Sequence, residues 1–178
     1  MNGRSTFNGN SASESTSTVQ ARSTSGNANS DSTTRSYIDL VSGASQFKLF
    51  GTSTQATASG FSISTTVTFE PFRLQRFDLS AGESYTQTYT IKTQSNFGSA
   101  PDQTVTSRVT FVGVERISVP AGSFEACRFL TEDTIGSNTA SSTTWIATGS
   151  GTSIKTVSGN TESVLVSGST NGMALTGN

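Results

Sequence analysis

The alternation of side chains between Val109 and Val119 constrains the fold of this chain more than any other sequence feature. Most residues of this stretch are β-branched or aromatic, and such side chains pack well on a pleated sheet surface. Apolar residues occupy both sets of alternate positions, which predicts a central strand rather than an edge strand. The alternation places Glu115 on the same face as Phe111 and Ile117.

A tight turn is expected directly after this stretch. Pro120 has no N–H to donate to a sheet ladder, and Pro120-Ala121-Gly122 suits a turn in which proline fixes φ and glycine accepts a positive φ. Ser123 to Leu130 then forms the return strand, with Cys127 and Phe129 on one of its faces. The segment from Val109 to Leu130 is therefore predicted to be a β-hairpin.

The polar composition of the chain is compatible with strands that have one solvent-exposed face. Only 31% of the 178 residues are hydrophobic, but only 13% are charged and the net charge is -1, so the pattern does not indicate disorder. Threonine with scattered Val, Ile and Phe favours antiparallel sheet from about Ser36 onward. We expect one domain. Residues 1–34 form a polar Ser/Thr-rich segment, either flexible or an edge strand, and residues 35–178 form the antiparallel β domain.

Further strands are expected on both sides of the central hairpin, about nine to eleven in all. The segments with strand patterns are Tyr37–Val41, Gln46–Phe50, Phe61–Phe69, Tyr85–Ile91, Thr143–Thr148, Thr152–Val157 and Thr161–Ser167. Pro71–Gly82 fits neither period and predicts an irregular crossing or one helical turn. Thr131–Ser142 predicts a polar hairpin connection. The predicted fold is all-β with room for one short helix: a single curved antiparallel sheet, as a half-barrel or open barrel.

Two motifs resemble a pattern in exported bacterial proteins of unassigned function. Gly113, Glu115, Ile117, Val119, Pro120, Ala121, Gly122 and Phe124 match a G-x-E-x-V-x-V-P-A-G-x-F hairpin, and Trp145, Gly149, Gly151 and Lys155 resemble a W-x-x-x-G-x-G-x-x-K hairpin with one extra residue. The resemblance covers Phe111 to Val157. It implies a half-barrel similar to periplasmic lipoprotein carriers, and a periplasmic or outer-membrane-associated location. The chain opens on polar residues that form no signal peptide, so we expect any export signal upstream of Met1.

Several function classes are disfavoured by what the sequence lacks. There is no histidine, which removes Ser-His-Asp and Cys-His catalysis and histidine metal sites, and the single Cys127 is expected to be a buried, inert thiol. Eleven Lys and Arg residues without a basic patch argue against nucleic-acid binding. No apolar stretch reaches the length of a transmembrane helix. We expect no cofactor and no metal.

Carboxylates and aromatic side chains remain as candidate functional groups. Glu115 and Glu125 flank the Pro120 turn and Glu132-Asp133 lie further on, which leaves a carboxylate-based hydrolase as a third interpretation. We expect Glu115 instead to make a structural hydrogen bond or ion pair, with Arg128 or Lys155 as its partner.

The aromatic side chains suggest a ligand site on a concave sheet face, although a core role for them is the more economical interpretation. The residues concerned are Phe61, Phe69, Tyr85, Tyr89, Phe111 and Trp145. The favoured function is a non-enzymatic exported envelope protein that binds an apolar or lipid-like molecule. The alternative is a structural or adhesive surface domain that acts through its polar face or a sheet edge.

Overall fold

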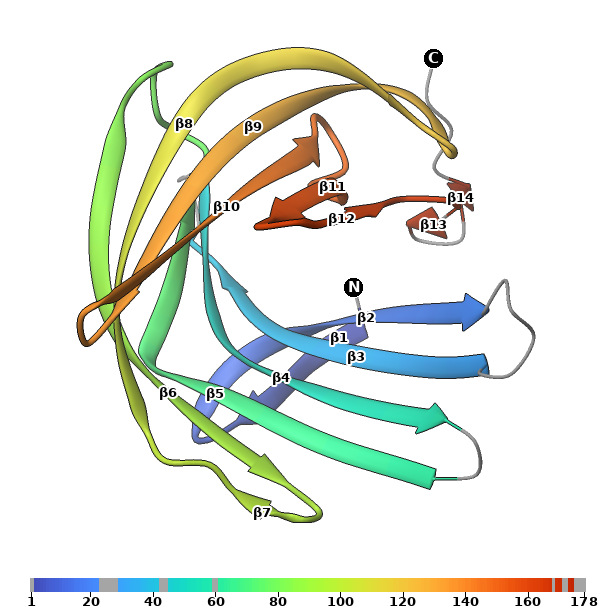
Figure 1. Ribbon diagram of the computed structural model, residues 1–178, viewed down its shortest axis with the longest axis vertical. Coiled ribbons are helices and arrows are strands. Elements are labelled where there is room, and N and C mark those ends of the chain that lie inside the picture. The colour runs from blue at the N-terminus through green and yellow to red at the C-terminus, as the bar shows by residue number, and fades with distance from the viewer. Residues whose placement is uncertain are drawn as a thin grey trace. The chain divides into compact units, whose positions relative to one another are not determined.

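The structure is a computed structural model that describes residues 2–22, 29–41, 45–58, 61–167, 169–170 and 173–174. These residues form strands, turns and connections, and none of them lies in a helix (Figure 1). The first five strands are β1 (Asn2–Phe7), β2 (Asn10–Arg22), β3 (Asn29–Leu40), β4 (Gln46–Ala58) and β5 (Phe61–Arg76). The next four are β6 (Ser84–Ser95), β7 (Gly98–Ser99), β8 (Gln103–Val119) and β9 (Gly122–Ile135). The last five are β10 (Asn138–Ala147), β11 (Ser153–Ser158), β12 (Thr161–Val164), β13 (Ser169–Thr170) and β14 (Met173–Ala174).

Twelve of these strands form one antiparallel sheet. The order is β1-β2-β3-β4-β5-β6-β8-β9-β10-β11-β12, with β7 paired to β6, and β13 pairs with β14 separately. Nearly every strand therefore pairs with its neighbour in sequence, as short hairpin connections demand. The sheet is open in the described part of the chain, because its order begins at β1 and ends at β12. The predicted all-β, open antiparallel fold is confirmed.

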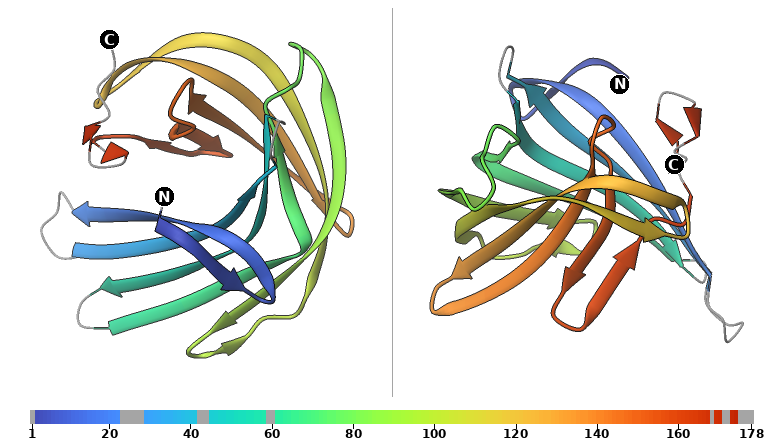
Figure 2. Two further views of the ribbon diagram at one scale, coloured as in Figure 1. Left: turned by 180° about the vertical axis from the view of Figure 1, so that it is seen from behind. Right: turned by 90° about the horizontal axis from the view of Figure 1, so that it is seen from above.

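The chain divides into two compact units. Unit 1 comprises Met1–Arg76 and Tyr89–Thr104, and unit 2 comprises Phe77–Thr88 and Val105–Asn178. In unit 1, the strands β1 to β5 follow one another as neighbours (Figure 2). In unit 2, the hairpin of β8 and β9 bends along its length (Figure 1).

The hydrophobic core of unit 1 is built where the β1–β2 hairpin reaches β3 and β4. Phe7 stacks on Tyr37 with ring centroids 4.2 Å apart, and it is buried together with Ala12 and Phe50. Gly51 is required there, because a Cβ on Gly51 would overlap both the Phe7 ring and the Val67 carbonyl oxygen. The small residue lets an aromatic ring lie flat on the sheet.

Unit 2 has apolar side chains buried on both faces of the β8–β9 hairpin. Val105, Val109 and Phe129 are buried on one face, where Phe77 and Phe111 contact the Phe129 ring at 5.7 and 5.2 Å between centroids. The other face holds a cluster of Ala126, Trp145, Ala147 and Ile154. Both faces of this hairpin are thus buried, but the central position predicted for Val109–Val119 holds only as far as Phe111, where pairing on the side of β8 away from β9 ends.

A β-bulge in β8 changes which alternate side chains of this strand point to each of these two faces. Phe111 lies opposite Phe129 and Gly113 lies opposite Arg128, so β8 has one extra residue at this point. Directly opposed residues share a face, and Phe129 and Arg128 are on different faces, so Phe111 and Glu115 are too. The prediction that Glu115 shares a face with Phe111 is wrong, because it assumed an unbroken alternation.

Strand boundaries differ from the predictions in three places. Pro71–Arg76 belongs to β5, so only the segment that follows it, up to the start of β6, is irregular. Most of Thr131–Ser142 lies in β9 and β10, with a turn at Gly136-Ser137. The described residues of the segment 1–34 lie mainly in β1, β2 and the first half of β3. The turn at Pro120-Ala121 and the hairpin at Gly159-Asn160 are confirmed.

Candidate functional site at the free edge of β8

The second half of β8 is an exposed edge of unit 2. The N–H of Phe111 donates to the Glu83 carbonyl at 2.9 Å, and the N–H of Gly82 donates to the Phe111 carbonyl at 2.8 Å. These bonds lie just before the first residue of β6, so β6 has no residues left to pair with β8 after Phe111. Among the described residues, β9 is the strand that pairs with the remaining part of β8, up to Val119.

The hairpin geometry shows which backbone groups of this edge point away from β9. Val119 and Gly122 close a two-residue hairpin, and such a closing pair exchanges its N–H and C=O groups across the ladder. Counting back by twos, Glu115 and Ile117 also face β9. The backbone of Val114 and Ser118 is therefore directed outward, where another strand would add.

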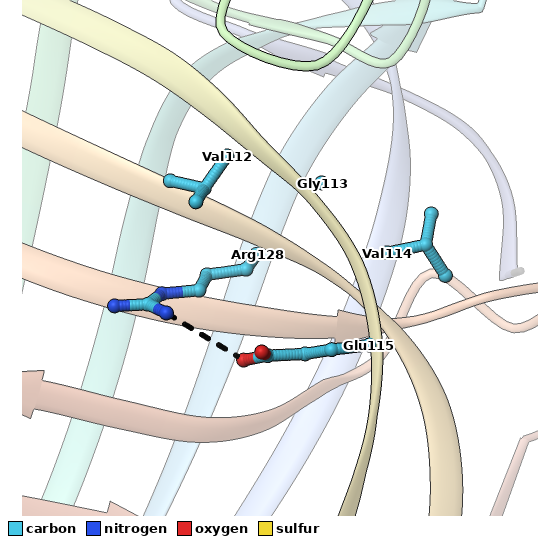
Figure 3. A pocket seen from close by; sticks show the side chains of 5 residues that line it. All are labelled: Val112, Gly113, Val114, Glu115 and Arg128. Atoms are coloured by element: carbon cyan, nitrogen blue, oxygen red, sulfur yellow. Dashed lines mark ion pairs between the residues drawn. The ribbon is translucent and has the colours of Figure 1, made fainter.

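A shallow cavity of about 100 Å³ lies at the bulge (Figure 3). Its lining consists of Val112, Gly113, Val114, Glu115 and Arg128. Val112 and Val114 expose 42% and 53% of their surface, which is high for valine in a strand. Gly113 has φ +147°, a conformation that side chains with a Cβ rarely adopt. The glycine thus allows the bulge that brings valine and charged side chains to one place.

Glu115 is held by two partners from neighbouring strands. The indole Nε1–H of the buried Trp145 donates a hydrogen bond to Glu115 Oε1, and Arg128 Nη1 lies 3.9 Å from the same oxygen (Figure 3). The expected structural role of Glu115, with Arg128 as a partner, is confirmed. The Nε of Arg128 is buried without a hydrogen-bond partner, so this guanidinium has donor capacity that the protein does not use.

Trp145 lies between two cations contributed by the adjacent strands. Arg128 and Lys155 are its direct neighbours on β9 and β11, and Arg128 Cζ and Lys155 Nζ both lie 5.4 Å from the Trp145 ring. Lys155 pairs with Glu162 at 2.9 Å rather than with Glu115. Each cation is therefore matched by a carboxylate, and the stack stabilises the sheet through cation–π contacts.

The six aromatic residues predicted to line one concave face do not form one lining. In unit 1, Phe69 packs edge-on against the buried Tyr89 at 5.6 Å, whereas Phe61 is 73% exposed. In unit 2, Phe111 contacts Phe129 and Trp145 lies opposite Arg128, which places these two rings on opposite faces. Tyr85, the sixth residue, is half-buried in β6. The bulge again explains the difference within unit 2.

The other charged candidates are paired or isolated. Glu132 lies 3.7 Å from Arg108, and Asp133 has a buried Oδ1 without a hydrogen-bond partner. The Cys127 thiol is half-buried, and its pKa is raised first by burial and then by the negative charge of Glu125. Within the described residues, no group of three or more His, Cys, Asp and Glu side chains is arranged to hold a metal ion.

A larger cavity of about 310 Å³ lies in unit 1, and its lining is polar. It is formed by Asn8, Thr66, Thr68, Lys92, Thr93, Gln94, Ser99, Ala100 and Asp102. The β8 cavity equals roughly three water molecules in liquid volume, too little to enclose an acyl chain. The lipid-like ligand therefore stays a prediction that neither cavity supports. The described residues also contain no helix long and apolar enough to cross a membrane.

The chain matches no protein family model, no curated protein and no solved structure. The site described above rests on the residues alone. Sequence reasoning found Glu115, Arg128 and Trp145 but missed the free edge, and the one signal for it was Gly113 in the middle of a strand pattern.

Proposed function

We propose that this protein is a non-enzymatic interaction domain of the bacterial envelope that binds an extended segment of another protein along the free edge of β8. The observation that carries the proposal is the edge itself: outward backbone groups at Val114 and Ser118 beside exposed valine side chains. Strand addition at such an edge uses main-chain hydrogen bonds for affinity and alternate side chains for specificity.

A second copy of this chain fits the same edge in fewer registers than a foreign strand does. In antiparallel pairing of two β8 edges, the registers centred on Arg116 or on Glu115 place like charges directly opposite one another, which is destabilising. A β-branched side chain opposite the exposed Val114 fits this edge. The proposed partner is therefore a different chain with an extended segment rich in β-branched residues.

The charged residues support binding rather than catalysis. Glu70, Glu115, Glu132 and Glu162 each have a cationic neighbour within 4 Å. A carboxylate-based glycosidase needs one carboxylate kept protonated and another held across a cleft from it. Export rests on the resemblance of the Gly113–Phe124 and Trp145–Lys155 motifs, and fractionation of bacteria that express the complete gene tests it directly. Recovery in the cytoplasmic fraction would argue against the envelope assignment.

The edge is tested with a fluorescent peptide of about ten residues, the length of a long strand, with alternating Val and Thr. Its fluorescence anisotropy should rise with protein concentration. Val114→Lys should abolish binding, because a charge on an edge opposes pairing. The matched control is Val164→Lys on β12, which should leave binding unchanged. Binding that survives Val114→Lys, or no binding by the unmodified protein, would overturn the edge proposal.

A further inference from the structure

The larger cavity, in unit 1, has the composition of a site for a hydrophilic molecule. Its volume of about 310 Å³ lies at the lower end of the range for ligand pockets, roughly 300–1,000 Å³. Such pockets are mostly lined by apolar and aromatic side chains, whereas this one presents hydroxyl, amide, ammonium and carboxylate groups. An apolar ligand gains little from such a lining.

Two neighbouring strands build the floor of this cavity. Thr66 and Thr68 of β5 lie directly opposite Gln94 and Lys92 of β6, so the four side chains share one face of the sheet. Two hydroxyls, an amide and an ammonium are thereby held at the regular spacing of a sheet. The rigid backbone fixes their positions relative to one another.

The turn between β1 and β2 forms one wall of the cavity. Asn8 has φ +46° and its Nδ2 donates to Thr68 Oγ1 at 3.0 Å, which fixes the amide over the floor. The end of β7 and the segment that follows it form another wall with Ser99, Ala100 and Asp102, and the N–H of Ala100 donates to the Thr93 carbonyl at 3.0 Å. The walls are therefore tied to the floor by hydrogen bonds.

The charges of the cavity exclude simple ions as the preferred ligand. Lys92 Nζ lies 2.7 Å from Glu70 Oε2, and the hydrogen bond and charge of Glu70, with a smaller contribution from Asp102, raise the pKa of Lys92. One cation between two carboxylates attracts an anion weakly, and the ammonium itself repels a metal ion. A neutral molecule that both donates and accepts hydrogen bonds suits this lining.

We infer that this cavity binds a neutral hexose unit of a carbohydrate. Sugar hydroxyls accept from the ammonium of Lys92 and the amide groups of Asn8 and Gln94, and they donate to the carboxylate of Asp102. The lining contains no aromatic ring for a sugar to stack on. The site is therefore expected to have millimolar rather than micromolar affinity. This inference concerns unit 1 and is independent of the β8 edge.

The test is an amide NMR titration of the ¹⁵N-labelled protein with glucose, galactose, mannose and N-acetylglucosamine, each up to about 100 mM, well above millimolar affinity. At least one sugar should shift the amides of residues 8, 66–68, 92–94 and 99–102 in a saturating manner. Absence of saturating shifts with all four sugars, or shifts confined to other residues, would overturn the inference.

Two variants on β5 distinguish sugar binding in the cavity from a general effect on the sheet. Thr66→Val keeps the side-chain shape but removes a lining hydroxyl, and it should weaken sugar binding about fivefold, the effect of one lost hydrogen bond. Thr65→Val makes the same change on the opposite face of β5 and should leave the affinity unchanged. Equal effects of the two variants would contradict a site in this cavity.

Discussion

The indole N–H of Trp145 donates to the carboxylate of Glu115, a residue 30 positions earlier in the sequence. The bond links β10 to β8 across the intervening β9, and Arg128 on β9 contacts both partners. Three strands are thus tied together by one small polar network on a face that also holds a hydrophobic cluster. The network gives a structural role to a glutamate in a strand that is otherwise rich in valine.

Removal of the Glu115 carboxylate is expected to destabilise unit 2. Glu115→Ala leaves the buried indole N–H without an acceptor, which costs about 1–3 kcal/mol in the free energy of unfolding. Glu115→Gln keeps a neutral oxygen acceptor and should cost less. Urea unfolding followed by Trp145 fluorescence measures both values. Equal losses for the two variants would show that the charge, rather than the hydrogen bond, is what matters.

Gly51 should not tolerate a methyl group. Gly51→Ala forces the Phe7 ring and the Val67 carbonyl apart and should cost about 1–3 kcal/mol, as overpacked sites do. Thermal unfolding monitored by circular dichroism measures the loss. In a Phe7→Ala background one of the two obstacles is gone, so Gly51→Ala should cost less there. Strictly additive losses would contradict the close ring contact.

Ser107 is expected to be replaceable by alanine with a gain in stability. Its side chain is fully buried, and its hydroxyl has no hydrogen-bond partner in the structure. Burying an unpaired hydroxyl is unfavourable, so Ser107→Ala should raise the free energy of unfolding by up to about 1 kcal/mol. Ser118→Ala is the control, because the Ser118 hydroxyl is bonded to Ser123 Oγ at 2.7 Å and its removal should not stabilise. Destabilisation by Ser107→Ala would show that the hydroxyl is satisfied in solution.

The Cys127 thiol should ionise at higher pH than an ordinary cysteine. Burial and the charge of Glu125 raise its pKa above the usual value of 9.0, so at pH 8 the folded protein should react with thiol reagents more slowly than the urea-unfolded chain. Because the pKa is higher in the folded than in the unfolded state, the free energy of unfolding falls when the pH rises above the unfolded pKa. The contribution of the neutral thiol is present below pH 9.0 and is lost as pH rises through the higher folded pKa. Equal reaction rates for folded and unfolded chains would contradict the burial.

Much of the fold was predictable because the residues that form its turns are recognisable from the local sequence. The turn at Pro120-Ala121 and the hairpin at Gly159-Asn160 follow from residues that only a few turn types accept. Thr131–Ser142 was expected to be a loop, because threonine and serine carry little hydrophobic signal. Pairing of β9 with its neighbours makes these residues strand all the same, since β-structure depends on context more than on propensity.

The site was less predictable than the fold, because it depends on strand register and on the face to which each side chain points. The side-chain types at Glu115, Arg128 and Trp145 suggested an ion pair and a core ring, and the structure contains both. The free edge depends on where β6 begins relative to β8, which is a long-range relationship that one sequence does not encode visibly. The separation of Phe111 from Glu115 depends on a single extra residue.

Because of that extra residue, the odd-numbered side chains of β8 lie on one face of the sheet before the bulge and on the other face after it. Upstream of Val112, the odd-numbered side chains lie on the face of the hairpin that holds the Phe77 and Phe129 rings. Downstream of Val112, they lie on the face that holds Trp145. A one-residue deletion at Val112 would remove the bulge and leave Gly113 to Val119 opposite their present partners on β9, so each of these side chains would keep its face. The position in this part of β8 that can lose a residue without exchanging core and solvent positions is therefore the bulge, which lies inside a strand rather than in a connection.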